Sequence, residues 1–433
     1  MSPLLAAATP SVHETERLVF FTLIQLIAIL ASARIAGRIA RLFGQPRVVG
    51  EIVGGLIMGP SLFGKLFPEQ FDFVFKSIPM TPVVILSQIG LALLMFQIGL
   101  EFDFSHLKEK RNRKAVISIS AAGIIVPFIL GWLIGHWSRP YLAPDFHGRG
   151  YRLFIAVALS ITAIPVLGRI MMELGINKLP LGAIAITAAA LDDVTGWTLL
   201  AIVSAVAQAE FSAAAFTTQV GLLIAYLAAC HFLVRPLLRR MVDVLLPGDG
   251  HLPHDLMAIM IMIIFASGLI TYKLGVFVIF GGFVAGVMLH DHHRFVAAWK
   301  NAVSHFVTVF FLPIFFTFTG LRTNVHGLDS LALWGWCLAI IGAATVGKFA
   351  GCSLAAHFCG LSWPDAGCLG IMMNTRALME LVVINVGFDL GVIPPNVFTM
   401  LVLMAIFSTV ITAPFLRYYF GRIGYKYKLQ ADV

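Results

Sequence analysis

The chain has 433 residues, of which 59% are hydrophobic and only 12% are charged, and its mean hydropathy is +0.91. Soluble globular domains carry about 25% charged residues, so this composition excludes an ordinary water-soluble fold. The formal net charge of +8 does not predict nucleic-acid binding, because the basic residues are spread over short loops such as "KEKRNRK" (108–114). The five cysteines include no CxxC pair and predict neither a disulfide nor a metal site.

Apolar stretches of about 20 residues recur along the chain, and each is long enough to cross a hydrocarbon core of about 30 Å. We therefore predict an all-α integral membrane protein with about 13 transmembrane helices. The predicted domains are a short N-terminal segment (1–17), one transmembrane domain (18–420) and a short tail (421–433). The predicted spans are residues 18–42, 46–64, 80–101, 115–137, 152–172, 180–207, 214–235, 254–272, 275–290, 301–320, 330–357, 364–388 and 394–418.

The loops between these spans alternate in their content of lysine and arginine, and the basic loops fall on the same side as the C-terminal tail. The positive-inside rule places that side in the cytoplasm, so we predict an extracytoplasmic N-terminus, a cytoplasmic C-terminus and a location in the cell (inner) membrane. The segment before the first span lacks the basic region and cleavage site of a signal peptide, so the first span should be retained. No enzymatic activity is predicted, and no GxxxxGK[ST] motif occurs to drive transport with ATP.

The fifth predicted span contains "LSITAIPVLGRI" (159–170). Proline removes a backbone donor and clashes with the preceding turn, so Pro165 predicts a break in the helix near Ser160–Pro165. Thr162 and the carbonyl groups released by the break would then face a cavity.

The sixth predicted span contains "AAALDDVTGW" (188–197), which places Asp192 and Asp193 side by side near the middle of the membrane. An ionisable residue at such a depth indicates a functional site and needs a partner. Lys348, in "ATVGKFAGC" (344–352), can reach a similar depth, so we predict a buried aspartate–lysine pair. A carboxylate can hold a proton or bind a metal cation, and this mutual exclusion at one site is sufficient for ion exchange.

The twelfth predicted span contains "MMNTRALMEL" (372–381), where Asn374, Thr375, Arg376 and Glu380 interrupt an apolar run. Arg376 and Glu380 are four residues apart and should pair on one helix face. If spans 1–6 and 8–13 form two inverted repeats joined by span 7, the two interruptions occupy the fifth position of each repeat. Broken helices at matching positions of two repeats predict a transport site at the membrane midplane.

Three histidines, His290, His292 and His293, occur together in "LHDHHRF" (289–295), in a predicted cytoplasmic loop. Histidine titrates near neutral pH, so this loop could sense pH or bind a metal adventitiously, but an ordinary polar loop is the favoured interpretation.

Four stretches, taken in order with the aspartate pair, resemble the monovalent cation:proton antiporter-2 family, which holds NapA-type sodium/proton antiporters, Kef-type potassium efflux systems and plant cation/proton exchangers. "GQPRVVGEIVGGLIMGPSLFG" (44–64), with Glu51 as its acidic residue, resembles the second-helix motif, and "LLMFQIGLEFD" (93–103) resembles the third-helix signature. "LSITAIPVLGRIMMELG" (159–175) and "MNTRALMELVVINVGFDLGVI" (373–393) are similar to the two crossing helices, and the second is nearest to the plant form.

The resemblance implies an antiporter fold of two inverted repeats, with a panel domain that forms a homodimer and a core domain that carries the site across the membrane like an elevator. It implies that Asp193 binds the proton or the cation, that Asp192 forms a salt bridge with Lys348, and that Thr162 lines the ion site. Asn374, Arg376, Glu380 and Glu51 are then structural polar residues near the crossing helices. The expected partners are monovalent cations, protons, membrane lipid and a second copy of the chain, with no cofactor.

The predicted function is exchange of a monovalent cation, with Na⁺ favoured and K⁺ or Li⁺ as alternatives, for protons. Kef-type potassium efflux remains an alternative, although such systems usually carry glutamine at the first aspartate position and an appended soluble domain, and this chain has neither feature. An organic-anion symporter with an inverted-repeat fold is a second alternative, and a channel or a sensor without flux are further ones.

Overall fold

The computed structural model describes residues 12–100, 110–162, 167, 170–171, 179–208, 213–247, 251–274, 278–376 and 378–423. These residues form helices joined by turns and short loops, and no strand occurs among them. Ten of the helical segments are long and apolar enough to cross a membrane. The prediction of an all-α integral membrane protein is therefore confirmed, whereas the number of 13 spans stays a prediction.

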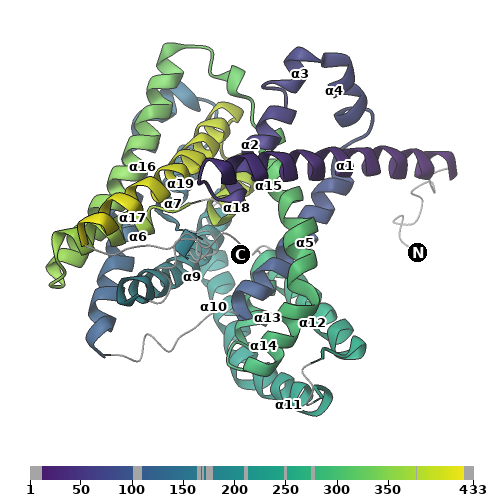
Figure 1. Ribbon diagram of the computed structural model, residues 1–433, viewed down its shortest axis with the longest axis vertical. Helices are drawn as coiled ribbons and strands as arrows, with labels where there is room; N and C mark the ends of the chain where they lie inside the picture. Colours follow the sequence, from purple (N-terminus) through teal and green to yellow (C-terminus); the bar gives the residue numbers. More distant parts are fainter. Residues whose placement is uncertain are drawn as a thin grey trace.

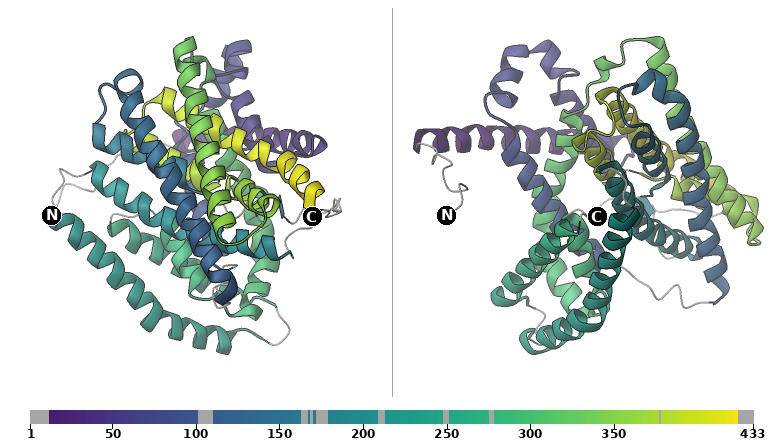
Figure 2. Two further views of the ribbon diagram at one scale, coloured as in Figure 1. Left: turned by 90° about the vertical axis from the view of Figure 1, so that its left-hand side faces the viewer. Right: turned by 180° about the vertical axis from the view of Figure 1, so that it is seen from behind.

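The helices pack in two groups, which alternate along the chain (Figures 1 and 2). The first group, which we call the panel group, includes α1, which extends to the right in Figure 1, and α11, which lies at the bottom. It consists of α1 (Val12–Leu42), α2 (Arg47–Met58), α3 (Phe63–Leu66), α4 (Pro68–Phe75), α5 (Thr81–Leu100), α10 (Ala213–Ala229), α11 (Arg235–Leu245), α12 (His254–Lys273), α13 (Val278–Val287), α14 (His293–Trp299) and α15 (Leu312–Leu321).

The second group, which we call the core group, holds the predicted site. Within it, α6 packs on α7, α9 and α16, and α16 packs on α17 and α19. It consists of α6 (Lys110–Leu142), α7 (Gly148–Ser160), α9 (Pro180–Gln208), α16 (Leu331–Phe358), α17 (Trp363–Met373), α18 (Leu378–Asp389) and α19 (Pro395–Ile423).

The panel group is held together by close contact between helix backbones. A Cβ atom on Gly55 of α2 would lie 2.0 Å from the carbonyl oxygen of Thr317 in α15, so a residue without a side chain is required there. The Thr317 hydroxyl donates a hydrogen bond of 3.1 Å to the Glu51 carbonyl. Helices in membranes associate through such small-residue contacts, because lipid supplies no hydrophobic drive between helices.

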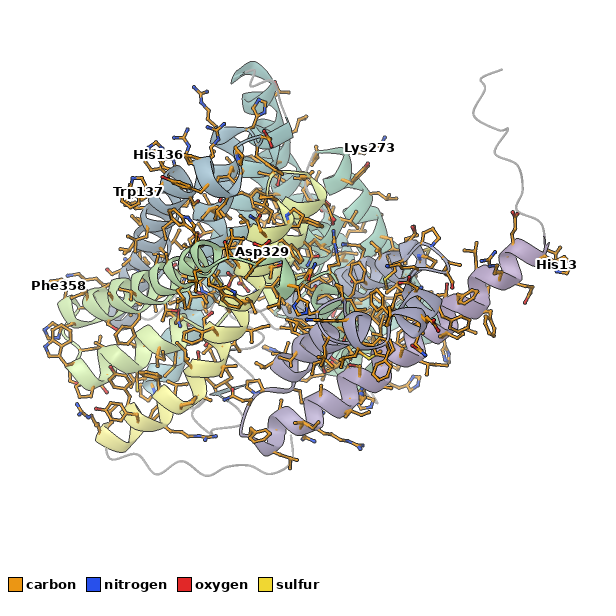
Figure 3. The ribbon with its side chains drawn as sticks, turned by 90° about the horizontal axis from the view of Figure 1, so that it is seen from above. His13, His136, Trp137, Lys273, Asp329 and Phe358 are labelled. Atoms are coloured by element: carbon orange, nitrogen blue, oxygen red, sulfur yellow. The ribbon has the colours of Figure 1, made fainter. Side chains whose placement is uncertain are left out.

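The N-terminal helix is one of the least covered parts of the panel group. α1 extends well beyond its neighbours, with His13 near its outer end (Figure 3), and only 22% of its most apolar segment is buried. Large apolar side chains along it, including Phe20 and Ile27, are more than half exposed. A helix with this composition and exposure is suited to contact lipid or another apolar surface.

Both predicted helix interruptions coincide with helix ends. α7 ends at Ser160, whereas Pro165, to which the break was attributed, lies outside the described residues. In the second case α17 ends at Met373 and α18 begins at Leu378, so the interruption predicted around Asn374–Arg376 is confirmed. The predicted span 364–388 thus contains two short helices, α17 and α18.

Candidate functional site

The two adjacent aspartates lie in α9, the helix that packs against α6, α7 and α17. Asp192 is fully buried and Asp193 is 2% exposed. The surrounding turns of α9 are formed by small and apolar residues, including the buried Ala188 and Ala189, which allow neighbouring helices to approach closely. Both carboxylates are therefore removed from solvent within a bundle of apolar helices, an environment that is costly for a charge without compensating contacts.

Asp192 receives these contacts from three other elements. The Lys348 ammonium of α16 donates to Oδ2 at 2.8 Å, and the Thr162 hydroxyl lies 2.9 Å from the same oxygen. The Ser120 hydroxyl of α6 donates to Oδ1 at 2.7 Å. The predicted aspartate–lysine pair is thus present, and the carboxylate is bound at both oxygens, as a buried anion requires.

Lys348 also bonds to the end of α7, and α6 lies beside the ion pair. Its ammonium donates a second hydrogen bond, of 2.5 Å, to the Ser160 carbonyl at the end of α7. A Cβ atom on Gly123 of α6 would lie 3.7 Å from both Lys348 Nζ and Asp192 Oδ2, and 2.7 Å from the sulfur of Cys352. The absence of a side chain at Gly123 therefore lets α6 lie directly against the ion pair.

The last four carbonyl groups of α7 show why the helix can end inside the bundle. Carbonyls at a helix end lack intrahelical partners and carry partial negative charge. The Val157 carbonyl accepts a hydrogen bond from the Ser160 hydroxyl, and the Ser160 carbonyl accepts one from Lys348. The carbonyls of Ala158 and Leu159 accept hydrogen bonds of 3.0 and 2.5 Å from the two terminal nitrogens of Arg376. The buried side chains of Lys348 and Arg376 thus cap the C-terminal end of α7 by donating to its last carbonyl groups.

The end of α17 meets the end of α7 at Thr162, whose hydroxyl lies 3.1 Å from the Met373 carbonyl. Three residues later, Arg376 is 3.3 Å from Glu380, so the pair predicted from their spacing is present. The Arg376 carbonyl accepts a hydrogen bond from Thr409 of α19. Arg376, in the segment between α17 and α18, is therefore bonded to α7, α18 and α19.

The structure brings most, but not all, of the predicted site residues together. Asp192, Thr162 and Lys348 are in direct contact, and Arg376 reaches the same end of α7. Asn374 is fully buried at the end of α17. Glu51 is buried in α2 of the panel group, where its carbonyl bonds to α15.

Ser120 is a site residue that the sequence did not reveal. It lies within an apolar stretch, "AVISISAAG" (115–123), and isolated serines are common in membrane helices because they can bond to their own backbone. Its position opposite Asp192 depends on the packing of α6 against α9 and α16, which no local pattern encodes.

The three histidines of the 289–295 segment do not converge on one point. Nε2 of His292 lies 2.9 Å from the Asp243 carboxylate of α11, while its Nδ1 accepts a hydrogen bond from the Phe295 amide. Nδ1 of His290 lies 2.7 Å from the Val287 carbonyl. Among the described residues no group of three histidine, cysteine or acidic side chains could hold a metal ion, so the structure gives the metal interpretation no support.

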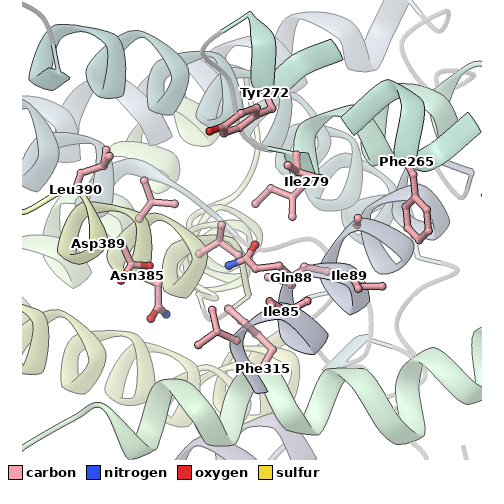
Figure 4. Close-up of a pocket in the computed structure, with 16 residues that line it drawn as sticks. Ile85, Gln88, Ile89, Phe265, Tyr272, Ile279, Phe315, Asn385, Asp389 and Leu390 are labelled. Atoms are coloured by element: carbon pink, nitrogen blue, oxygen red, sulfur yellow. The ribbon is translucent and has the colours of Figure 1, made fainter. Parts of the chain in front are cut away.

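A separate cavity of about 420 Å³ lies between α5, α12, α13 and α15 of the panel group and α18 of the core group (Figure 4). Its lining is apolar apart from Gln88, Tyr272, Asn385 and Asp389, and it includes neither aspartate of α9. Arg322, at the end of α15, donates a hydrogen bond of 2.9 Å to the Asn385 amide oxygen and pairs with Asp389. This cavity is therefore a feature of the boundary between the two groups and not the aspartate site.

Comparison with known proteins places this architecture in a family. Residues 26–418 match the protein family described as "sodium/hydrogen exchanger, transmembrane". This chain belongs to the transmembrane sodium/hydrogen exchanger family. Its fold is similar to that of the sodium proton antiporter MjNhaP1 from Methanocaldococcus jannaschii, with a TM-score of 0.65, 15% sequence identity, and coverage of 92% of this chain and 99% of that one.

Two relatives of this chain are named as antiporters, one for Na⁺ and H⁺ and the other for K⁺ and H⁺. The chain is 36% identical over 400 residues to the Na(+)/H(+) antiporter NhaS4 of Synechocystis sp., covering 90% of this chain and 95% of that protein. It is 31% identical over 377 residues to the K(+)/H(+) antiporter 1 of Saccharomyces cerevisiae, covering 86% of this chain but only 43% of that protein. The family resemblance stated from the sequence motifs is thus confirmed.

Proposed function

We propose that this exchanger is a secondary active antiporter that moves a monovalent cation, Na⁺ by preference with K⁺ or Li⁺ as alternatives, in exchange for protons. The observation that carries the proposal is the balance of buried charge in the core group. Among its described residues, three carboxylates (Asp192, Asp193 and Glu380) and two basic side chains (Lys348 and Arg376) are fully or almost fully buried. With all five ionised, the bundle holds one excess negative charge, which one proton or one monovalent cation would neutralise.

In this proposal Asp193 is the carboxylate at which the proton and the cation compete. Asp192 is already bound by Lys348, Thr162 and Ser120, so its oxygens are committed to protein donors. Asp193 is the adjacent carboxylate in the same helix, and carboxylate oxygens are suitable ligands for a hard cation. Thr162 and the ends of the interrupted helices would line the path of the ion.

We further propose that the core group moves against the panel group to expose the site alternately to the two sides of the membrane. The alternation of panel and core segments along the chain is the pattern that two inverted repeats would produce. The exposed apolar face of α1 supports a homodimer formed through the panel group. The distribution of lysine and arginine supports a cytoplasmic C-terminus in the cell membrane.

The test is ion exchange in liposomes that contain the purified protein. Wild type and Asp193→Asn would be compared under an imposed pH gradient, with Na⁺, K⁺ and Li⁺ added in turn and a pH-sensitive dye as the readout. We expect wild type to dissipate the gradient with a saturable cation preference, and Asp193→Asn to lose this activity.

Asp329→Asn provides a matched control, since Asp329 is an exposed aspartate before α16 and should leave exchange unchanged. A wild type that moves no protons with any of the three cations between pH 6 and pH 9 would refute the antiporter proposal. In that case an organic-anion symporter becomes the next candidate to test.

A further inference from the structure

The hydroxyl of Ser120 differs from many of the hydroxyls in the described helices in the partner to which it donates. Serine and threonine in a membrane helix commonly donate to the carbonyl four residues earlier in their own helix. Thr187 does so at 2.8 Å, Thr195 at 2.7 Å and Thr308 at 2.8 Å. Ser120 instead donates its one proton across the bundle, from α6 to Asp192 in α9. A hydroxyl has a single proton, so the bond to Asp192 replaces the local one.

The bond reaches the oxygen of Asp192 that Lys348 does not use. Lys348 and Thr162 are bonded to Oδ2, whereas Ser120 donates to Oδ1 at 2.7 Å. A carboxylate bound at one oxygen can rotate about its Cβ–Cγ bond, since this torsion has a broad energy minimum. Donors on both oxygens, from three different helices or helix ends, fix the plane of the group.

The fixed orientation matters because a second carboxylate is adjacent. Asp193 follows Asp192 in α9, and Lys348 carries the only side-chain ammonium group among the fully buried described residues. If Asp192 turned away from Lys348, the ammonium would be attracted to Asp193 and would compete there with a bound cation. Ser120 would prevent this by keeping Asp192 directed at Lys348.

We propose that Ser120 is a positioning residue of the exchange reaction: it orients Asp192 toward Lys348 and thereby keeps the Lys348 ammonium from competing with the transported ion at Asp193. The proposal rests on the antiport function proposed above. It assigns to α6 a direct part in the site, through the hydroxyl of Ser120 and the close approach permitted at Gly123.

The experiment compares wild type, Ser120→Ala and Ser120→Thr in liposomes, with the cation concentration that gives half-maximal exchange and the maximal rate measured separately at several pH values. A hydrogen bond to a charged group is worth enough to change an equilibrium about tenfold or more. We therefore expect Ser120→Ala to raise the half-maximal cation concentration by roughly tenfold, with a larger change at low pH, where protons compete. Ser120→Thr keeps the hydroxyl and should remain within about twofold of wild type.

Ser138→Ala is the matched control. Ser138 is a fully buried serine of the same helix, but it bonds to Tyr151 at 3.0 Å and not to the aspartates, so the half-maximal concentration should not change. The proposal is overturned if wild type exchanges ions and Ser120→Ala keeps the wild-type cation dependence and pH profile, or if Ser138→Ala shifts them equally. A wild type without exchange overturns the antiport function and this proposal together.

Discussion

At the scale of single residues, the Asp192–Lys348 pair shows how a charge can be stable inside a membrane protein. Moving either ion out of water costs several kcal/mol even after relaxation, and the attraction between the two ions only roughly offsets that cost. The remainder is supplied by neutral donors and acceptors, here Ser120 and Thr162 for the carboxylate and the Ser160 carbonyl for the ammonium. The pair is therefore better explained by function than by stability.

Mutations of Asp192 and Lys348 should have non-additive effects on stability. Asp192→Asn or Lys348→Met alone leaves the opposite charge buried without its ion-pair partner, and each should lower the stability by about 3–5 kcal/mol. The double variant removes both charges and should be less destabilised than the sum of the single variants. Thermal unfolding of the purified proteins in detergent would measure this.

The control is the exposed pair Asp72–Lys76 of the α4 segment, whose side chains are 56% and 64% exposed. Asp72→Asn should change stability by less than about 1 kcal/mol. If the effects of Asp192→Asn and Lys348→Met simply add, the two charges do not stabilise each other in the folded protein.

At the scale of helices, the distinguishing feature is that α7 and α17 end inside the bundle and meet there. In lipid, each backbone group without a partner costs several kcal/mol, so an internal helix end requires donors from elsewhere. Arg376 supplies donors to the carbonyls of Ala158, Leu159 and Ala344, and Lys348 supplies one to Ser160. The guanidinium suits this role because its planar fork can reach several acceptors at once.

Arg376→Lys should therefore be destabilising although it conserves the charge. A lysine ammonium is a compact donor group and cannot span the same carbonyls, so about two hydrogen bonds to a charged group would be lost, at a cost of roughly 3–6 kcal/mol. Thermal unfolding in detergent would detect this. Arg422→Lys, at an exposed arginine that lies over Tyr418, should have little effect, and an equal loss at both sites would contradict the capping role.

Outside the apolar spans, Asp291 links the turn after α13 to α11 through Arg235 and Arg239. Partial burial raises the pKa of Asp291, but the hydrogen bond from Arg239 and the charges of Arg235 and His290 outweigh it and lower the pKa from 3.8 to about 2. Because the folded pKa is depressed, the stabilisation is present above about pH 4 and is lost as the pH falls toward 2.

Asp291→Asn should consequently lower stability by about 1 kcal/mol, since the group is partly exposed, and by the same amount at pH 5.5 and pH 8.5. Melting temperatures at the two pH values would test this. A loss that disappears at pH 5.5 would mean that Asp291 titrates in the working range and that this segment responds to pH.

At the scale of the whole molecule, the boundary between the panel and core groups determines whether the two can move. It contains the apolar cavity beside α18 (Figure 4) and a polar link in which Arg322 of the panel group contacts Asn385 and Asp389 of the core group. The Arg322 guanidinium also lies 4.8 Å from the ring centre of Phe388. If the groups slide during transport, these contacts must break in each cycle.

Arg322→Gln should then raise the maximal exchange rate by about two- to fivefold, because breaking a partly exposed ion pair would no longer contribute to the barrier. The half-maximal cation concentration should stay unchanged, since Asp192 and Asp193 are not involved. Arg152→Gln is the control, because Arg152 bonds to Gly148 within the core group. A change in cation dependence without a change in rate would instead connect Arg322 to ion binding.

The sequence by itself determined the membrane class, the two helix interruptions, a buried aspartate–lysine pair and the pair Arg376–Glu380, whereas the choice of Asp192 as the partner of Lys348 came from the family resemblance. These follow from local properties, namely the length of apolar runs, the effect of polar residues within them, and the cost of a charge in hydrocarbon. Only the tertiary structure decided that Ser120 holds the second oxygen of Asp192, that Arg376 and Lys348 complete the end of α7, and that the helices divide into two groups with a cavity between them. These features depend on which carbonyl and hydroxyl groups of distant helices face each other. Every residue carries a backbone carbonyl, so no local pattern identifies the ones that meet a donor.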